Sequence, residues 1–161
     1  MGGQVQVRRV AQTVLKAGSW KGTALICSLD YDARFLRRKT LASDDGTSFL
    51  VDLPHTTSLE HGDALRLSDD TLVQIVAAPE PVLHVGGPNL TQLAWHIGNR
   101  HTPCQILPDM LVIRDDAVIG HMLEHLGARL THAVQPFTPE GGAYGHGRTH
   151  SHAHGATAHD H

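Results

Sequence analysis

The chain has 161 residues, enough for one domain or two small ones, and only 4% are aromatic, so we expect a core of Leu, Val, Ile and Ala. The formal charge is −3 with histidines neutral, and because Lys and Arg are not in excess we expect no nucleic-acid binding. No apolar run reaches about 18 residues, so we expect no membrane span. Two cysteines form no disulfide framework, and the N-terminus lacks the apolar segment of a secretory signal, so we expect a cytoplasmic protein.

The first half of the sequence reads as short strands separated by turns. Asp45-Gly46 lies between two apolar runs, which is a strong hairpin signal. Short strands with turns every eight to twelve residues, and no helical period, predict a small all-β sandwich or open barrel. We place this N-terminal β domain at residues 1–78. The β-rich segments are Val5 and Val7, 23–29, 34–42, 49–53 and two strands within 61–78.

Three prolines between residues 79 and 88 mark a change of pattern, and we expect the domain boundary at Pro79–Pro81. A strand at 82–85 should open the second domain. Asn89 is a suitable N-cap for a helix that must stop near Pro103. The apolar stripe of this helix is predicted to contain Leu90, Leu93, Ala94 and Ile97.

Two strands, at 104–107 and 110–114, should follow, and Asp115 or Asp116 should cap a second helix. Gly127 sits where a helix-terminating glycine belongs, and 128–137 supplies a last strand. The order β-α-β-β-α-β is typical of a ferredoxin-like domain, so we expect an α+β protein with this domain at 79–140. The apolar face of the second helix is predicted to contain Val118, Ile119, Met122, Leu123 and Leu126.

Three histidines on these helices are candidate metal ligands. His101 lies eleven residues after Leu90, within roughly 20° of it on a helical wheel, so it should end the first helix on the apolar side. Taken alone, a histidine there is more often packed, or placed at a helix C-terminus, than bound to metal. His121 and His125 belong to "HMLEH", which matches the H-x-x-E-H pattern of inverted zinc proteases. They fall opposite the apolar stripe, which favours a solvated face.

A thiol near His101 offers one more pairing. Cys104 follows His101 by three residues and could share a metal with it, although an apolar cysteine within a strand is the simpler interpretation.

The C-terminal segment, residues 141–161, is rich in histidine and too polar to pack, so we expect it to be disordered. Neutral imidazole is a common ligand for Zn, Ni, Cu and Co. The histidines of this segment are interrupted by Gly, Ala, Thr and Ser, which favours a native metal-binding tail over a purification tag. The candidate tail ligands are His146, His150, His152, His154, His159 and His161.

Stretches such as "GNRHTP" at 98–103 and "APEPVL" at 78–83 together resemble the UreE family of urease accessory proteins. The most specific is "GNRHTP" at 98–103, and the likeness extends over nearly the whole chain. The resemblance implies an N-terminal β domain described as peptide-binding, a ferredoxin-like metal-binding domain, and a variable His-rich tail at 141–161. The other stretches are "APEPVL" (78–83), "LAWHIGNRHTPCQI" (93–106), "DDAVIGHMLEHLG" (115–127) and "FTPEGGAYGHG" (137–147).

The resemblance also implies a role for His101, which matches the family's metal-binding histidine at a homodimer interface. It implies a nickel metallochaperone, not an enzyme, that binds Ni(II), with Zn(II) possible at the same site. Such a protein delivers nickel to apo-urease with the urease accessory GTPase and the maturation complex. Residues 114–122, "RDDAVIGHM", lack the histidines that many relatives carry there, so we expect no auxiliary site of that kind. The alternatives are a zinc hydrolase using 121–125, or a nickel and zinc storage protein.

Overall fold

The structure is a computed structural model of the chain, and it describes residues 9–141. The chain divides between Ala78 and Pro79 into two compact units. The predicted α+β class is confirmed, because the described residues form ten strands and two helices. Within residues 9–141, neither helix is long and apolar enough to cross a bilayer.

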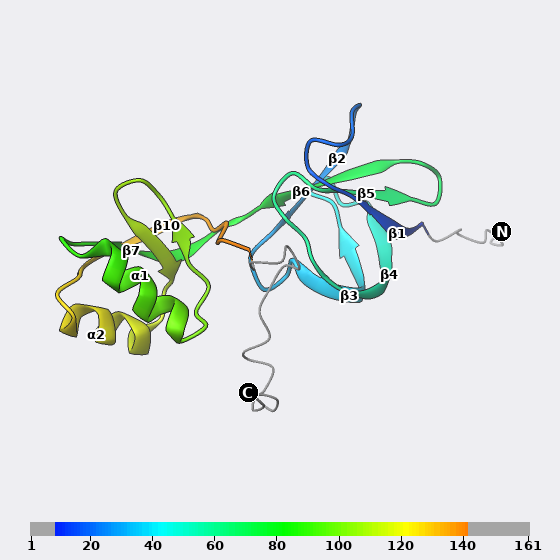
Figure 1. Ribbon diagram of the computed structural model, residues 1–161. Helices are drawn as coiled ribbons and strands as arrows, with labels where there is room; N and C mark the ends of the chain where they lie inside the picture. Colours follow the sequence, from blue (N-terminus) through cyan, green and yellow to red (C-terminus); the bar gives the residue numbers. More distant parts are fainter. Residues whose placement is uncertain (1–8, 142–161) are drawn as a thin grey trace. The chain divides into compact units, whose positions relative to one another are not determined.

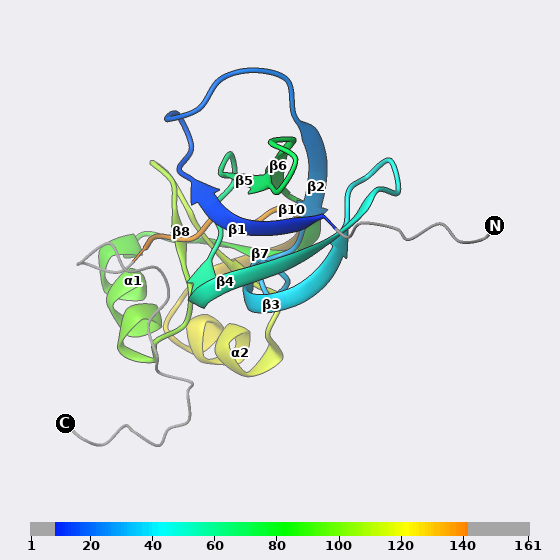
Figure 2. The same cartoon turned by 90° about the vertical axis from the view of Figure 1, so that its right-hand side faces the viewer.

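The first unit is a curled six-stranded sheet with the strand order β2-β6-β5-β1-β4-β3 (Figures 1 and 2). Burial alternates along β6, which places every second side chain in the core and leaves those between them only partly buried. The core includes Phe49, Val51, Leu65 and Ile75. The strands are β1 (Val10–Leu15), β2 (Leu25–Leu29), β3 (Phe35–Ala42), β4 (Ser48–Ser58), β5 (Ala64–Leu67) and β6 (Leu72–Ala77).

The hairpin predicted at Asp45-Gly46 is confirmed. Strands β3 and β4 pair antiparallel on either side of it, and Gly46 has a φ of +91°, which glycine adopts without strain. The turn also joins the two edges of the curled sheet at one end. The backbone N–H of Asp44 donates to the carbonyl of Ile26 at 2.7 Å, and the Ser28 hydroxyl donates to the Asp44 carboxylate at 2.8 Å.

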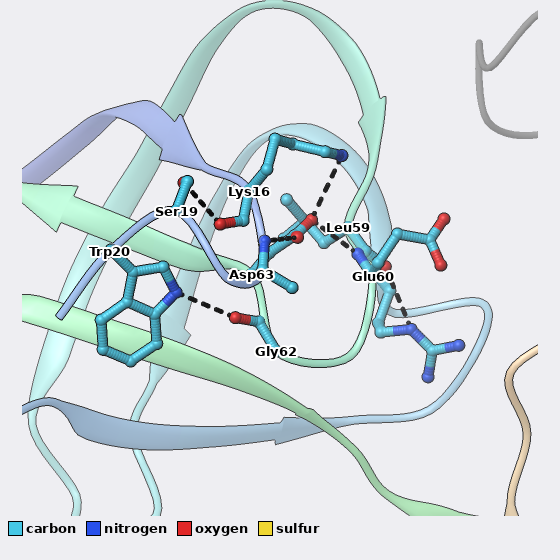
Figure 3. A network of polar contacts seen from close by, with 9 residues as sticks. Lys16, Ser19, Trp20, Leu59, Glu60, Gly62 and Asp63 are labelled. Atoms are coloured by element: carbon cyan, nitrogen blue, oxygen red, sulfur yellow. Dashed lines mark hydrogen bonds and ion pairs between the residues drawn. The ribbon is translucent and has the colours of Figure 1, made fainter.

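A buried carboxylate holds two loops of the first unit together (Figure 3). Asp63 is 1% exposed and accepts hydrogen bonds from the backbone N–H groups of Ala17 and Glu60, both at 2.9 Å. The carboxylate also forms an ion pair with the ammonium of Lys16, with an N–O distance of 3.6 Å. The indole N–H of Trp20 donates to the carbonyl of Gly62 at 3.0 Å. These contacts fix the loop after β1 against the turn before β5.

The second unit is a four-stranded sheet with both helices on one face (Figure 1). Its order is β10-β7-β9-β8, and all neighbouring strands are antiparallel. Leu93 and Ile97 from α1, and Leu123 from α2, pack against the sheet as the stripes predicted. The elements are β7 (Pro79–Gly86), α1 (Leu90–Asn99), β8 (Gln105–Ile106), β9 (Leu111–Arg114), α2 (Ala117–His125) and β10 (Arg129–Pro136).

Strand β7 begins three residues earlier than predicted. Pro79 and Pro81 belong to it and pair only with β10, whereas pairing with β9 starts at Val82. Proline lacks an N–H, so it is tolerated where a strand has a neighbour on one side only.

The apolar face predicted for α2 is wrong at two positions. Val118 is 73% exposed, and Leu126, which follows the helix as its C-cap, is 39% exposed. The helix packs through Ile119, Gly120 and Leu123. A Cβ on Gly120 would lie 3.2 Å from the side chains of both Leu130 and Leu83, so the missing side chain lets the helix approach the sheet closely. This approach turns Val118 outward.

Both ends of α2 are fixed as predicted. The Asp116 side chain caps the N-terminus by accepting from the N–H groups of Val118 at 2.9 Å and Ile119 at 3.0 Å. Gly127 ends the helix with a φ of +94°. By contrast, Asn89 holds the N-cap position of α1 but makes no capping hydrogen bond with its side chain.

Replacing Asp116 by Ala should lower the free energy of unfolding of the second unit by about 1 kcal/mol, because two N–H groups lose their acceptor. Hydrogen exchange of the α2 amides, followed by NMR, measures this change. Asp115→Ala is the matched control, because within residues 9–141 the Asp115 side chain makes no cap and pairs only with the exposed His132, at 3.3 Å. An equal effect of the two substitutions would contradict the capping role.

Candidate metal centre

His101 lies just beyond α1, at the first residue after the helix C-cap. The helix ends at Asn99, so the prediction that His101 ends it on the apolar side is wrong. Its N–H donates to the carbonyl of Gly98 at 2.8 Å, and the N–H of Thr102 donates to the carbonyl of Ile97 at 3.2 Å. This pair of hydrogen bonds is a Schellman motif, which requires a left-handed residue. His101 supplies it with a φ of +58°.

The other helix ends with the same motif, which provides a comparison within the chain. The N–H of Gly127 donates to the carbonyl of Glu124, and that of Ala128 to the carbonyl of Leu123, both at 3.0 Å. There the left-handed residue is glycine, which bears no strain. A side chain in this conformation costs about 1 kcal/mol. The backbone alone therefore gives no reason for a histidine at 101.

The imidazole of His101 is available to bind a ligand. The residue is exposed, and the imidazole makes no hydrogen bond or ion pair with another residue in the range 9–141. It also lies at the C-terminal end of α1, where the helix dipole favours cations. Among the described residues, no group of three or more His, Cys, Asp or Glu side chains could hold a metal ion. A metal bound at His101 therefore needs ligands from elsewhere.

Cys104 is poorly suited to complete the site. Burial, and to a smaller extent the charge of Glu140, raise the pKa of its thiol to about 11. The side chain is half-buried and packs against the core of the second unit. Because the thiolate is the form that binds metal, the interpretation of Cys104 as an apolar packing residue fits this environment better, although it lies just before β8 and not within a strand.

The surface of α1 near His101 includes an apolar side chain that sequence reasoning missed. Trp95 is 63% exposed, and its ring meets that of His96 edge-on, with centroids 5.1 Å apart. Gly98 lies one turn further on, and a Cβ there would meet nothing within 4 Å. Trp95 does not belong to the predicted apolar stripe of α1. A large apolar residue outside that stripe is the one sequence signal that could have indicated its exposure.

None of the other candidate ligands named from the sequence is shown in contact with His101 among the described residues. His121, Glu124 and His125 are all exposed, in agreement with the solvated face predicted for them. Asp116 is occupied as a helix cap, and Asp115 contacts His132. The six candidate tail ligands, His146, His150, His152, His154, His159 and His161, lie outside the described residues.

Comparison with known proteins covers nearly the whole chain. Residues 8–78 match the family model of the UreE urease accessory protein N-terminal domain, and residues 80–161 match that of the C-terminal domain. The chain is 58% identical over 141 residues to the urease accessory protein UreE of Ruegeria pomeroyi, covering 88% of this chain and 95% of the relative. It is 57% identical over 145 residues to that of Rhodobacter capsulatus, covering 90% and 92%.

Proposed function

Because the chain belongs to the UreE family of urease accessory proteins, we propose that it is a metallochaperone that delivers Ni(II) to apo-urease. The family consists of accessory chaperones and not enzymes, and its role is in urease maturation. The expected partners are the urease accessory GTPase and the urease maturation complex, in the cytoplasm. The observation that carries the proposal is the exposed imidazole of His101, which has no hydrogen-bond or ion-pair partner among the described residues and lies on a turn with a left-handed backbone.

We further propose that the ion is held between the His101 side chains of two identical chains. A two-fold contact brings identical residues together, so one accessible histidine per chain becomes a pair. The incomplete ligand set among the described residues supports this arrangement. Exposed Trp95 offers apolar area to such a contact, and the open space beside Gly98 lets a second backbone approach.

Two imidazoles leave the coordination shell of nickel unfilled, and the tail histidines are proposed to complete it. All six of these histidines lie within residues 145–161 of the sequence. Exposed imidazoles can leave one at a time, and each must be unprotonated to bind, which suits a carrier that releases its cargo. Zn(II) competes for the same donor set, because imidazole sites discriminate weakly between these ions.

The two units have different parts in the proposed function: the second binds the metal and the first binds a partner protein. The element order β-α-β-β-α-β and the sheet order β10-β7-β9-β8 support a ferredoxin-like fold for the metal-binding unit. The first unit is proposed to bind a peptide segment of a partner. A zinc hydrolase using residues 121–125 finds no support in a family of accessory proteins.

A storage protein that merely buffers nickel or zinc is the alternative that an experiment can separate from a carrier. Replacing all six tail histidines by Asn should lower nickel uptake, yet this variant should still bind roughly one ion per two chains more than the same variant with His101→Gly, because the paired site remains. Equilibrium dialysis against Ni(II), with metal counted by atomic absorption, measures this stoichiometry. Light scattering on the same sample checks that the chains still pair. Loss of all bound nickel would support storage on the tail and contradict the paired site.

A further inference from the structure

Helix α2 carries two histidines that neither folding nor the proposed carrier site explains. His121 and His125 are exposed, and neither ring makes a hydrogen bond or ion pair with another residue in the part of the chain that the structure describes. Histidine is a weaker helix former than Lys, Arg, Glu or Gln, which usually fill such a face. Their presence therefore favours a chemical role.

Their spacing places the two residues one turn apart on the same face of the helix. Ala117–His125 is continuous α-helix, so residues 121 and 125 are one turn apart. Side chains at i and i+4 are neighbours, and two histidines at this spacing are a known arrangement for binding one transition metal ion.

The structure also holds this helix in place before any ion arrives. Asp116 caps one end and the Schellman motif at Gly127 closes the other. Gly120, between them in the sequence, packs the opposite face against Leu83 and Leu130. His125 lies in the last turn, where the helix dipole favours a cation. The ordering of the backbone is thus already complete, and binding need only order two side chains.

We propose that His121 and His125 form a second metal site, a two-imidazole chelate for a late first-row divalent cation, independent of His101. Water fills the remaining coordination positions, because no group of three or more candidate ligands forms among the described residues. Affinity should follow the order for nitrogen ligands, with Cu²⁺ bound more tightly than Ni²⁺ and Zn²⁺. An open site of this kind exchanges its ion quickly and offers a point of entry or exit for metal.

Histidine-specific labelling tests the site in the full chain. Diethyl pyrocarbonate modifies free imidazoles, and peptide mass spectrometry reads each residue separately, so ions on the tail do not obscure the result. With Zn²⁺ added beyond the capacity of the tail, His121 and His125 should both lose most of their labelling. His96 on α1 is the matched control, since positions 92 and 100, one turn to either side, are Gln and Arg. Its labelling should not change with metal.

Single substitutions separate a chelate from independent binding. In His121→Asn, the protection of His125 should disappear, and in His125→Asn that of His121, because one imidazole alone holds the ion weakly. In His101→Gly, protection of both should persist, which separates this site from the carrier site. Unchanged labelling with and without Zn²⁺ would overturn the proposal, as would protection of one histidine that survives loss of the other.

Discussion

Replacing His101 by Gly should abolish the nickel ion shared between two chains and, at the same time, make the second unit more stable. Removing the ligand takes away both halves of the paired site, because each chain contributes the same residue. Glycine adopts the left-handed conformation at position 101 without strain, so the free energy of unfolding should rise by roughly 0.5–1 kcal/mol. A substitution that removes function while adding stability identifies a residue kept for chemistry.

His101→Ala is the matched variant, because it removes the imidazole but keeps a Cβ in the left-handed region. It should lose the same ion without the gain in stability. Both variants are best measured in the chain whose six tail histidines are replaced by Asn, with nickel counted by equilibrium dialysis and stability by urea denaturation. If either variant bound as much nickel as the tail-substituted chain that keeps His101, the paired site would be refuted. If the two variants had the same free energy of unfolding, the strain argument for residue 101 would be refuted, but the paired site would not.

Features set by local chemistry could be predicted from the sequence. The turn at Asp45-Gly46, the cap at Asp116 and the glycine at 127 each depend on a few adjacent residues, and each is confirmed. The buried stripe of α1 follows from periodicity and is also confirmed.

Features set by long-range packing escaped prediction. Strand β1 has polar Gln12 and Thr13 at its centre and a register shift there, so it shows no clean alternation. Its identity as a strand depends on pairing with β4 and β5, about 40 and 50 residues away, which the local sequence does not reveal. The outward turn of Val118 likewise depends on the close approach that Gly120 allows.

The candidate site was predictable only in part, for two physical reasons. A Schellman motif is normally signalled by glycine, so a histidine in that place carries no local signal, and the end of α1 was placed too late. A single histidine is also a weak metal signal, because one chain does not bring a full ligand set together within its described residues. His101 therefore emerged from the resemblance of "GNRHTP" to a family and not from its own surroundings.

Replacing Asp63 by Ala should lower the free energy of unfolding of the first unit by about 3–4 kcal/mol. The carboxylate is 1% exposed, and the substitution leaves the N–H groups of Ala17 and Glu60 without their acceptor. Each such charged hydrogen bond contributes about 1.5–3 kcal/mol. Asp63→Asn should lose about half as much, because the amide oxygen can still accept from one of the two N–H groups.

Lys16→Met separates the hydrogen bonds of Asp63 from its ion pair. The Lys16 side chain is 68% exposed and 3.6 Å from the carboxylate, so its removal should cost less than about 1 kcal/mol. Trp20 fluorescence in a Trp95→Phe background reports urea unfolding of this unit alone, because Trp20 itself is bonded to Gly62. If Lys16→Met and Asp63→Ala were equally destabilising, the ion pair would dominate. The expected ranking instead assigns the stability of these loops to two backbone N–H groups that share one buried anion.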